Sequence, residues 1–93
     1  MKSVRFYIDP HTEQPHIYNH NVDEREVIEA LDNILKMDRS TEGSWIALGR
    51  TTGGRILKIV FVPDEDNLEN FVITAYDLRG KALAALRRRL RRT

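Results

Sequence analysis

The sequence contains no cysteine and no long apolar segment. The absence of cysteine excludes a disulfide framework, thiolate zinc sites and thiol catalysis. No apolar run approaches the ~18–20 residues that a membrane-spanning helix needs, and the N-terminal segment lacks an apolar signal core. The 93 residues, 41% hydrophobic and 31% charged, therefore predict a single domain over residues 1–93. We expect it in the cytoplasm, without a membrane partner.

The motifs of the common cofactor enzymes are also missing. The sequence has no phosphate-binding glycine loop, dinucleotide fingerprint, nucleophile elbow or paired-carboxylate motif, so no cofactor is expected. The three histidines, His11, His16 and His20, have a spacing that suggests metal binding. A zinc site would need a fourth ligand, and Pro15 argues against a helical pair of ligands. We therefore expect no metal site.

The last fifteen residues contain no acidic side chain. Residues 79–93 carry seven of the 15 lysines and arginines, a net charge of +7. Residues 1–78 carry the other eight and all 14 acidic residues, a net charge of −6. A segregated basic block favours an anionic partner, either nucleic acid or an acidic protein surface. The alternative is a solvated segment that only promotes solubility.

Two segments in the N-terminal half have clear structural signals. Residues 3–8 alternate apolar and polar side chains, as a half-buried strand does. Asp23 is a suitable helix N-cap, and Glu26, three residues later, completes a capping box. The apolar stripe of the helix that follows consists of Val27, Ile28, Leu31, Ile34 and Leu35. The polar residues 36–43 are expected to form a loop.

A glycine pair predicts a β-hairpin in the centre of the chain. Residues 44–52 and 55–62 flank two glycines, which readily supply the positive φ angles of a two-residue turn. That turn sets Arg50 opposite Leu57 and places Arg50 and Arg55 on one face of the hairpin. Both faces are rich in apolar residues, so we expect the hairpin in the centre of a sheet.

The remaining segments complete an α+β fold. Residues 63–70 form an acidic loop, residues 71–76 a final strand and residues 79–92 a basic amphipathic helix. The apolar side of this helix consists of Ala82, Leu83, Leu86 and Leu90. The predicted order is β-α-β-β-β-α, a small antiparallel meander sheet with both helices on one face.

Four side chains are candidates for chemistry. His20 precedes the first helix, where an imidazole can act as acid or base near neutral pH, although a single histidine equally suits a structural role. Arg50 and Arg55, at the hairpin tip, either clamp a phosphate or are solvated strand ends. Tyr76, at the end of the last strand, either donates a hydrogen bond or packs.

The terminal helix is the strongest binding signal. Several of its arginines stand four residues apart, a repulsive spacing that costs a free helix ~0.2–0.5 kcal/mol per pair. Arginine also suits bidentate binding of phosphate or carboxylate. The residues predicted to bind RNA or a protein partner are Lys58, Arg79, Lys81, Arg87, Arg88, Arg91 and Arg92.

Three segments resemble the BrnT-type toxins of bacterial type II toxin–antitoxin systems. Residues 15–27 are similar to the opening of these toxins, with His20 on the family histidine and Asn21 in place of a glycine. Residues 45–57 are similar to the central hairpin, and residues 71–76 to the last strand, which in the family usually ends in arginine. This chain has Tyr76 there, and its Tyr-Asp-Leu-Arg-Gly-Lys segment resembles a sister group with the same folding pattern.

The resemblance implies a RelE-like fold, metal-independent endoribonuclease activity and a bound antitoxin protein. In such enzymes the 2′-hydroxyl of RNA attacks its own phosphate, and the protein supplies a base, an acid and cations. His20 would then serve as acid or base, Arg50 and Arg55 as phosphate clamps and Tyr76 as a donor. Because Tyr76 replaces the family arginine, a non-catalytic module that binds nucleic acid or protein is the alternative.

Overall fold

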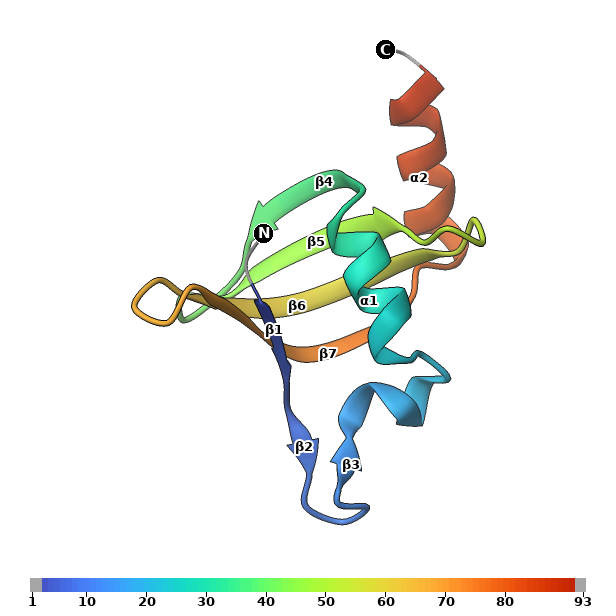
Figure 1. The fold of residues 1–93 in the computed structure, drawn as a ribbon. Coiled ribbons are helices and arrows are strands. Elements are labelled where there is room, and N and C mark those ends of the chain that lie inside the picture. The colour runs from blue at the N-terminus through green and yellow to red at the C-terminus, as the bar shows by residue number, and fades with distance from the viewer. Residues whose placement is uncertain (1–2, 92–93) are drawn as a thin grey trace.

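The computed structural model describes residues 3–91, which form a five-stranded sheet, a small hairpin and two α-helices (Figure 1). The elements in chain order are β1 (Ser3–Phe6), β2 (Ile8–Asp9), β3 (Gln14–Pro15), the 3-10 helix η1 (His16–His20), α1 (Glu24–Leu31), β4 (Ile34–Arg39), β5 (Trp45–Arg50), β6 (Ile56–Asp64), β7 (Glu69–Asp77) and α2 (Gly80–Arg91). The predicted α+β class is confirmed. Arg92, predicted to bind RNA, lies outside the described residues.

The sheet is mixed. Its strand order is β1-β7-β6-β5-β4, and β2 and β3 form a separate hairpin. Neighbours within the sheet are antiparallel except β1, which runs parallel to β7 with Ser3 opposite Glu69. The prediction of a purely antiparallel meander is therefore wrong. The central position of β5 and β6 is confirmed, and it follows from the apolar residues on both faces of these strands.

The first helix starts as predicted but ends earlier. The capping box is present, since the Glu26 amide donates to Asp23 and the Asp23 amide donates to the Glu26 carboxylate. The helix ends at Leu31, however, and β4 occupies residues 34–39. The expected continuation of the stripe is therefore wrong, and the predicted loop at residues 36–43 is correct only for residues 40–43. β4 pairs with the outer edge of β5, which supplies partners for backbone groups that would otherwise be unpaired.

The hairpin between β5 and β6 has a three-residue loop, so its predicted register is wrong by one residue. Thr51 and Arg55 pair through the Thr51 amide and the Arg55 carbonyl at 2.8 Å, and the Thr51 hydroxyl accepts from the Arg55 amide. Of the two glycines, Gly54 has a positive φ angle, +90°, as the last position of such a loop requires. A shift of one residue turns every side chain to the other face, so Arg50 and Arg55 lie on opposite faces.

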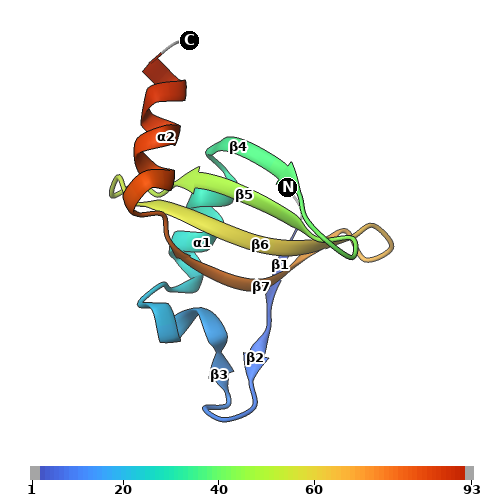
Figure 2. The same ribbon diagram turned by 180° about the vertical axis from the view of Figure 1, so that it is seen from behind.

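Each face of the sheet carries its own apolar cluster. The face under α1 contributes Ala47, Leu57, Ile59, Val72 and Ala75, all fully buried against Val27 and Ala30 of the helix. On the other face, Ile56 of β6 forms a smaller cluster with Leu78, which follows β7, and with Leu86 of α2. The prediction that both helices cover one face is therefore wrong (Figures 1 and 2).

α2 covers only one end of its face. In Figure 2 the helix stands at the end of the sheet and projects beyond it, and no helix of residues 3–91 lies over the middle of β5, β6 and β7. Within α2, Leu86 is buried and Leu83 and Leu90 are half-buried, as predicted, whereas Ala82 is exposed. Among the helices of residues 3–91, none has the length and apolar character that a membrane span requires.

Candidate nucleic-acid interface

A row of ring side chains runs along the outer edge of β7. The ring centroids of His16 and His20, both on η1, are 5.3 Å apart, and those of His20 and Tyr76 are 5.7 Å apart. On the neighbouring strand, the Lys58 ammonium lies 5.8 Å from the centre of the Tyr76 ring. η1 fits here because β1 pairs with only the first half of β7, which leaves the second half free to carry these side chains.

A carboxylate orients the first ring of the row. Asp9 Oδ2 is 3.2 Å from His16 Nδ1 and accepts a hydrogen bond from the Asn19 amide at 3.0 Å, while Oδ1 accepts from the His11 backbone amide. The His11 amide and then His16 lower the pKa of Asp9, which keeps it ionised. An ionised carboxylate only accepts, so it favours the His16 tautomer with the proton on Nδ1 and leaves Nε2 as an acceptor.

His20 and Tyr76 line a polar cavity of about 320 Å³. The other lining residues are Asn21, Asp77 and Arg79. Arg79 is 81% exposed and donates to Asp77 Oδ2 at 2.9 Å. The cavity thus offers an exposed imidazole, a phenol and an arginine to one ligand. The structure brings together three of the predicted residues, His20, Tyr76 and Arg79, and places Lys58 beside them.

Arg55 connects the elements that surround this cavity. Its Nε donates to Asp77 at 2.5 Å, and its Nη1 donates to both oxygens of Glu26 at 2.9 Å and to the Asn21 carbonyl at 2.8 Å. The guanidinium therefore joins the C-cap of η1, helix α1 and strand β7. The hydrogen bond from Arg55, ahead of that from Arg79, lowers the pKa of Asp77, and the same contact raises the pKa of Arg55. Since two carboxylates already occupy its donors, Arg55 stabilises the site's framework and is poorly placed to clamp a phosphate.

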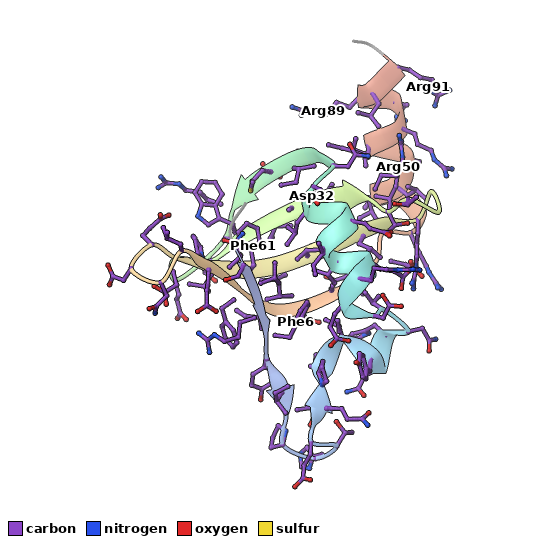
Figure 3. All side chains as sticks on the ribbon, in the orientation of Figure 1. Phe6, Asp32, Arg50, Phe61, Arg89 and Arg91 are labelled. Carbon is purple, nitrogen blue, oxygen red and sulfur yellow. The ribbon has the colours of Figure 1, made fainter. Side chains whose placement is uncertain are left out.

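The other predicted residues lie away from this cavity. Arg50 is exposed on the face opposite Arg55 and does not line the cavity. The predicted binding residues of α2 that the structure describes, Lys81, Arg87, Arg88 and Arg91, are all exposed. Figure 3 shows Arg89 and Arg91 extending to different sides of α2, so the arginines do not form a single track.

Sequence reasoning missed four residues near these surfaces. Asp9 gives no signal of its own, because a turn aspartate is ordinary, and His16 was considered only as a metal ligand. Among residues 3–91, no group of three or more His, Cys, Asp or Glu side chains is arranged to hold a metal ion. Lys36 and Arg89 line a second cavity, between α2 and the sheet. Lys36 was missed because its strand was expected to be a loop.

No protein family, curated protein or solved structure matches this chain.

Proposed function

We propose that this protein binds RNA and cleaves it without a metal ion at the cavity that contains His20. The observation that carries the proposal is the row of rings formed by His16, His20 and Tyr76. Arg79 lines the same cavity as His20 and Tyr76, and the Asp9 carboxylate contacts His16. Histidine is the side chain that exchanges protons near neutral pH, and nearby cations stabilise the charge that develops on a reacting phosphate. The resemblance to BrnT-type toxins, with a RelE-like fold and an antitoxin as binding partner, supports the same proposal.

Under this proposal each side chain of the cavity has a role. His20 takes the proton from the 2′-hydroxyl, whose oxygen then forms a bond to the adjacent phosphorus. The bond from phosphorus to the 5′-oxygen breaks, and the Tyr76 hydroxyl supplies the proton that this leaving oxygen gains. The products are a 2′,3′-cyclic phosphate and a 5′-hydroxyl end. Arg79 and Lys58 stabilise the charge on the phosphate, and His16 packs against His20 to set its orientation.

Incubation of the purified protein with RNA at low salt, with a chelator present, is expected to produce cleaved strands with cyclic phosphate ends. His20→Ala should lower the rate by about 10²–10⁴-fold, because it removes the proton acceptor. The matched control is His11→Ala, since His11 is also an exposed histidine but lies in the turn between β2 and β3. Equal activity of the His20→Ala and wild-type proteins would refute the assignment.

A non-catalytic module that binds nucleic acid or protein is the second candidate. It is favoured by the state of Arg55, whose charge is neutralised by Glu26 and Asp77, and by Tyr76 at the position of the family arginine. Under this candidate, wild-type and His20→Ala proteins bind RNA with equal affinity and neither cleaves it. Loss of cleavage with retained binding in His20→Ala would exclude the module and support the nuclease.

A further inference from the structure

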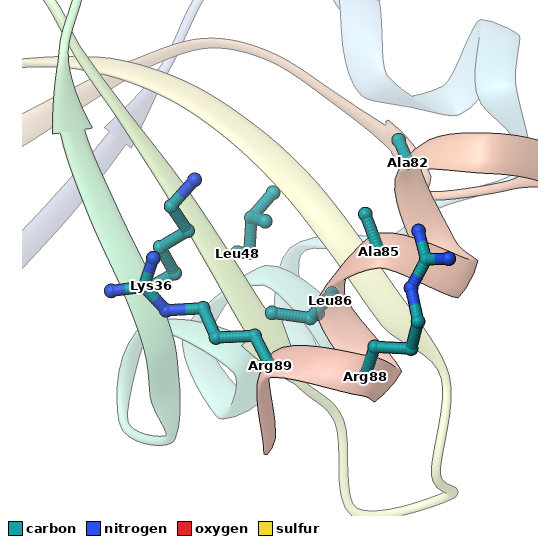
Figure 4. A pocket seen from close by; sticks show the side chains of 7 residues that line it. All are labelled: Lys36, Leu48, Ala82, Ala85, Leu86, Arg88 and Arg89. Carbon is teal, nitrogen blue, oxygen red and sulfur yellow. The ribbon is translucent and has the colours of Figure 1, made fainter. Parts of the chain in front are cut away.

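A second cavity, of about 830 Å³, lies between α2 and the sheet (Figure 4). Its floor is apolar, with Leu48 from β5 and Leu86 from α2, and its polar side chains are Lys36, Arg88 and Arg89. No acidic residue of the described range, 3–91, lines it. Figure 4 shows Arg89 extending from α2 toward β4, the strand that carries Lys36. The cavity therefore places cations from two elements around an open space, which favours an anionic ligand.

Within the described residues, these cations have little to neutralise them. Lys36 pairs with Asp38 at 3.3 Å, but that carboxylate is 55% exposed. Such exposed pairs are weak and are readily exchanged for a better anion. Neither Arg88 nor Arg89 has a carboxylate partner among residues 3–91. The cations at this cavity therefore differ from Arg55, whose guanidinium already binds the carboxylates of Glu26 and Asp77.

Cross-strand pairing connects this cavity to the cavity of His20. Lys36 on β4 pairs with Leu48, Leu48 pairs with Lys58, and Lys58 pairs with Tyr76, so the four lie side by side on the face opposite α1. The Tyr76 ring then leads to His20. Three strand spacings of ~4.8 Å make the distance from Lys36 to Tyr76 roughly 14 Å. Leu48 in this row also packs against the apolar cluster under α2, so the row passes beside this helix.

The residue types of the row distinguish between anionic ligands. An acidic peptide would gain from the cations but not from the faces of Tyr76 and His20. A single-stranded nucleic acid gains from both, because phosphates bind the cations and bases stack on the rings. Arg88 and Arg89 also suit the phosphate group through bidentate hydrogen bonds. A line with cations at Lys36 and Lys58 and rings at Tyr76 and His20 therefore favours a single strand over a peptide.

We propose that the cavity formed by Lys36, Arg88 and Arg89 is a backbone-binding subsite for single-stranded RNA, and that the strand crosses the sheet from there to His20. The proposal rests on the proposed function for the identity of the polymer. It adds a binding site three strands away from the reacting phosphate and a direction for the bound strand, perpendicular to the β-strands.

Binding of a labelled 2′-O-methyl RNA of about ten nucleotides tests the subsite. This probe keeps the phosphates but has no free 2′-hydroxyl, so its affinity is independent of cleavage. The variant is Lys36→Gln combined with Arg89→Gln, which removes one cation from each wall. We expect affinity at low salt to fall by about tenfold or more and the dependence on salt to weaken by about one to two counterions.

The matched control is Arg5→Gln combined with Arg25→Gln, which changes the net charge equally but lies on β1 and α1, away from the cavity. The control should keep nearly full affinity. An equal loss in both variants, or none in either, would overturn the proposal. The proposal would also be overturned if polyglutamate binding depended on Lys36 and Arg89 while RNA binding did not. Arg89→Gln alone gives a second measurement if the double variant melts at a lower temperature.

The proposed nuclease activity and the proposed subsite can be refuted independently of each other. If the wild-type protein binds the probe through Lys36 and Arg89 but cuts no RNA, the proposed nuclease is wrong and the subsite stands. If the protein cuts RNA while the double variant binds the probe as well as wild type does, the subsite is wrong and the nuclease stands.

Discussion

Gly49→Ala is expected to destabilise the protein by about 3 kcal/mol or more, enough to lower Tm by roughly 12 °C or more. A Cβ atom at this position would lie 2.1 Å from the Ala30 carbonyl oxygen and 2.7 Å from its carbonyl carbon. These are backbone atoms of the last turn of α1, so they cannot move without moving the helix. The φ angle of Gly49 is not positive, so the cost is steric. Thermal or urea unfolding measures it.

Gly53→Ala is the matched control for Gly49. The nearest atom to its added Cβ would be the Thr51 hydroxyl oxygen, at 3.9 Å, and its φ angle is also not positive. We expect a change within about 0.5 kcal/mol. Similar unfolding free energies for the two alanine variants would show that α1 does not rest on β5 as closely as the structure indicates.

Replacement of Arg55 by alanine is expected to cost about 2–3 kcal/mol. It leaves the carboxylates of Glu26 and Asp77, which are 22% and 21% exposed, without their shared cation. Breaking a fully buried pair costs ~3–5 kcal/mol, and the remaining exposure of this network reduces the loss. Arg79→Ala is the control, because Arg79 binds the same Asp77 but is 81% exposed, and we expect it to cost less than about 0.5 kcal/mol.

The dependence of stability on pH gives an independent check of the same network. The folded-state pKa of Asp77 is lowered, chiefly by Arg55, so ionised Asp77 stabilises the fold above its unfolded pKa of about 3.9. That contribution is lost as the pH falls through the lower, folded-state value. Wild type should therefore be more stable than Asp77→Asn at pH 7, and the difference should disappear under strongly acidic conditions. A difference that is constant with pH would contradict the ion pair.

The elements that follow from local chemistry were predictable from the sequence. Asp23 and Glu26 form a capping box from their own backbone and side-chain groups, so four residues suffice to indicate it. The apolar content of both faces of β5 and β6 likewise indicated a central hairpin. The basic character of α2 also needs no tertiary information. The structure has these features as predicted because no contact with a distant segment competes with them.

The failures arise where tertiary contacts override a local pattern. Ile34 and Leu35 continue a helical stripe in sequence, yet pairing with β5 draws them into a strand. The two glycines permit a two-residue turn, but the Thr51 hydroxyl favours a longer loop by bonding the Arg55 amide. That single-residue difference separated Arg50 from Arg55. The partners of Arg55 were equally hidden, since Glu26 and Asp77 are distant in sequence.

The orientation of His16 could not be predicted because it depends on how the β2–β3 hairpin places Asp9 against it. Asp9 and His16 belong to the two sides of the β2–β3 hairpin, and the sequence does not reveal that this hairpin folds back toward the end of β7. The candidate site was therefore predicted as single residues, His20 and Tyr76. Their common cavity became visible only in three dimensions.

The parallel pairing of β1 with β7 also bears on how the chain folds during synthesis. Ser3 pairs with Glu69, so the first strand leaves the ribosome long before its partner does. Contacts between such distant residues carry a large loop-closure entropy and form late, after the local hairpins of β4 to β7. The Tyr7 amide continues the pairing to Val72, and the Tyr7 carbonyl accepts from the His16 amide. Docking of β1 on β7 would therefore bring the histidine segment to the sheet, so that the site forms at the last step of folding.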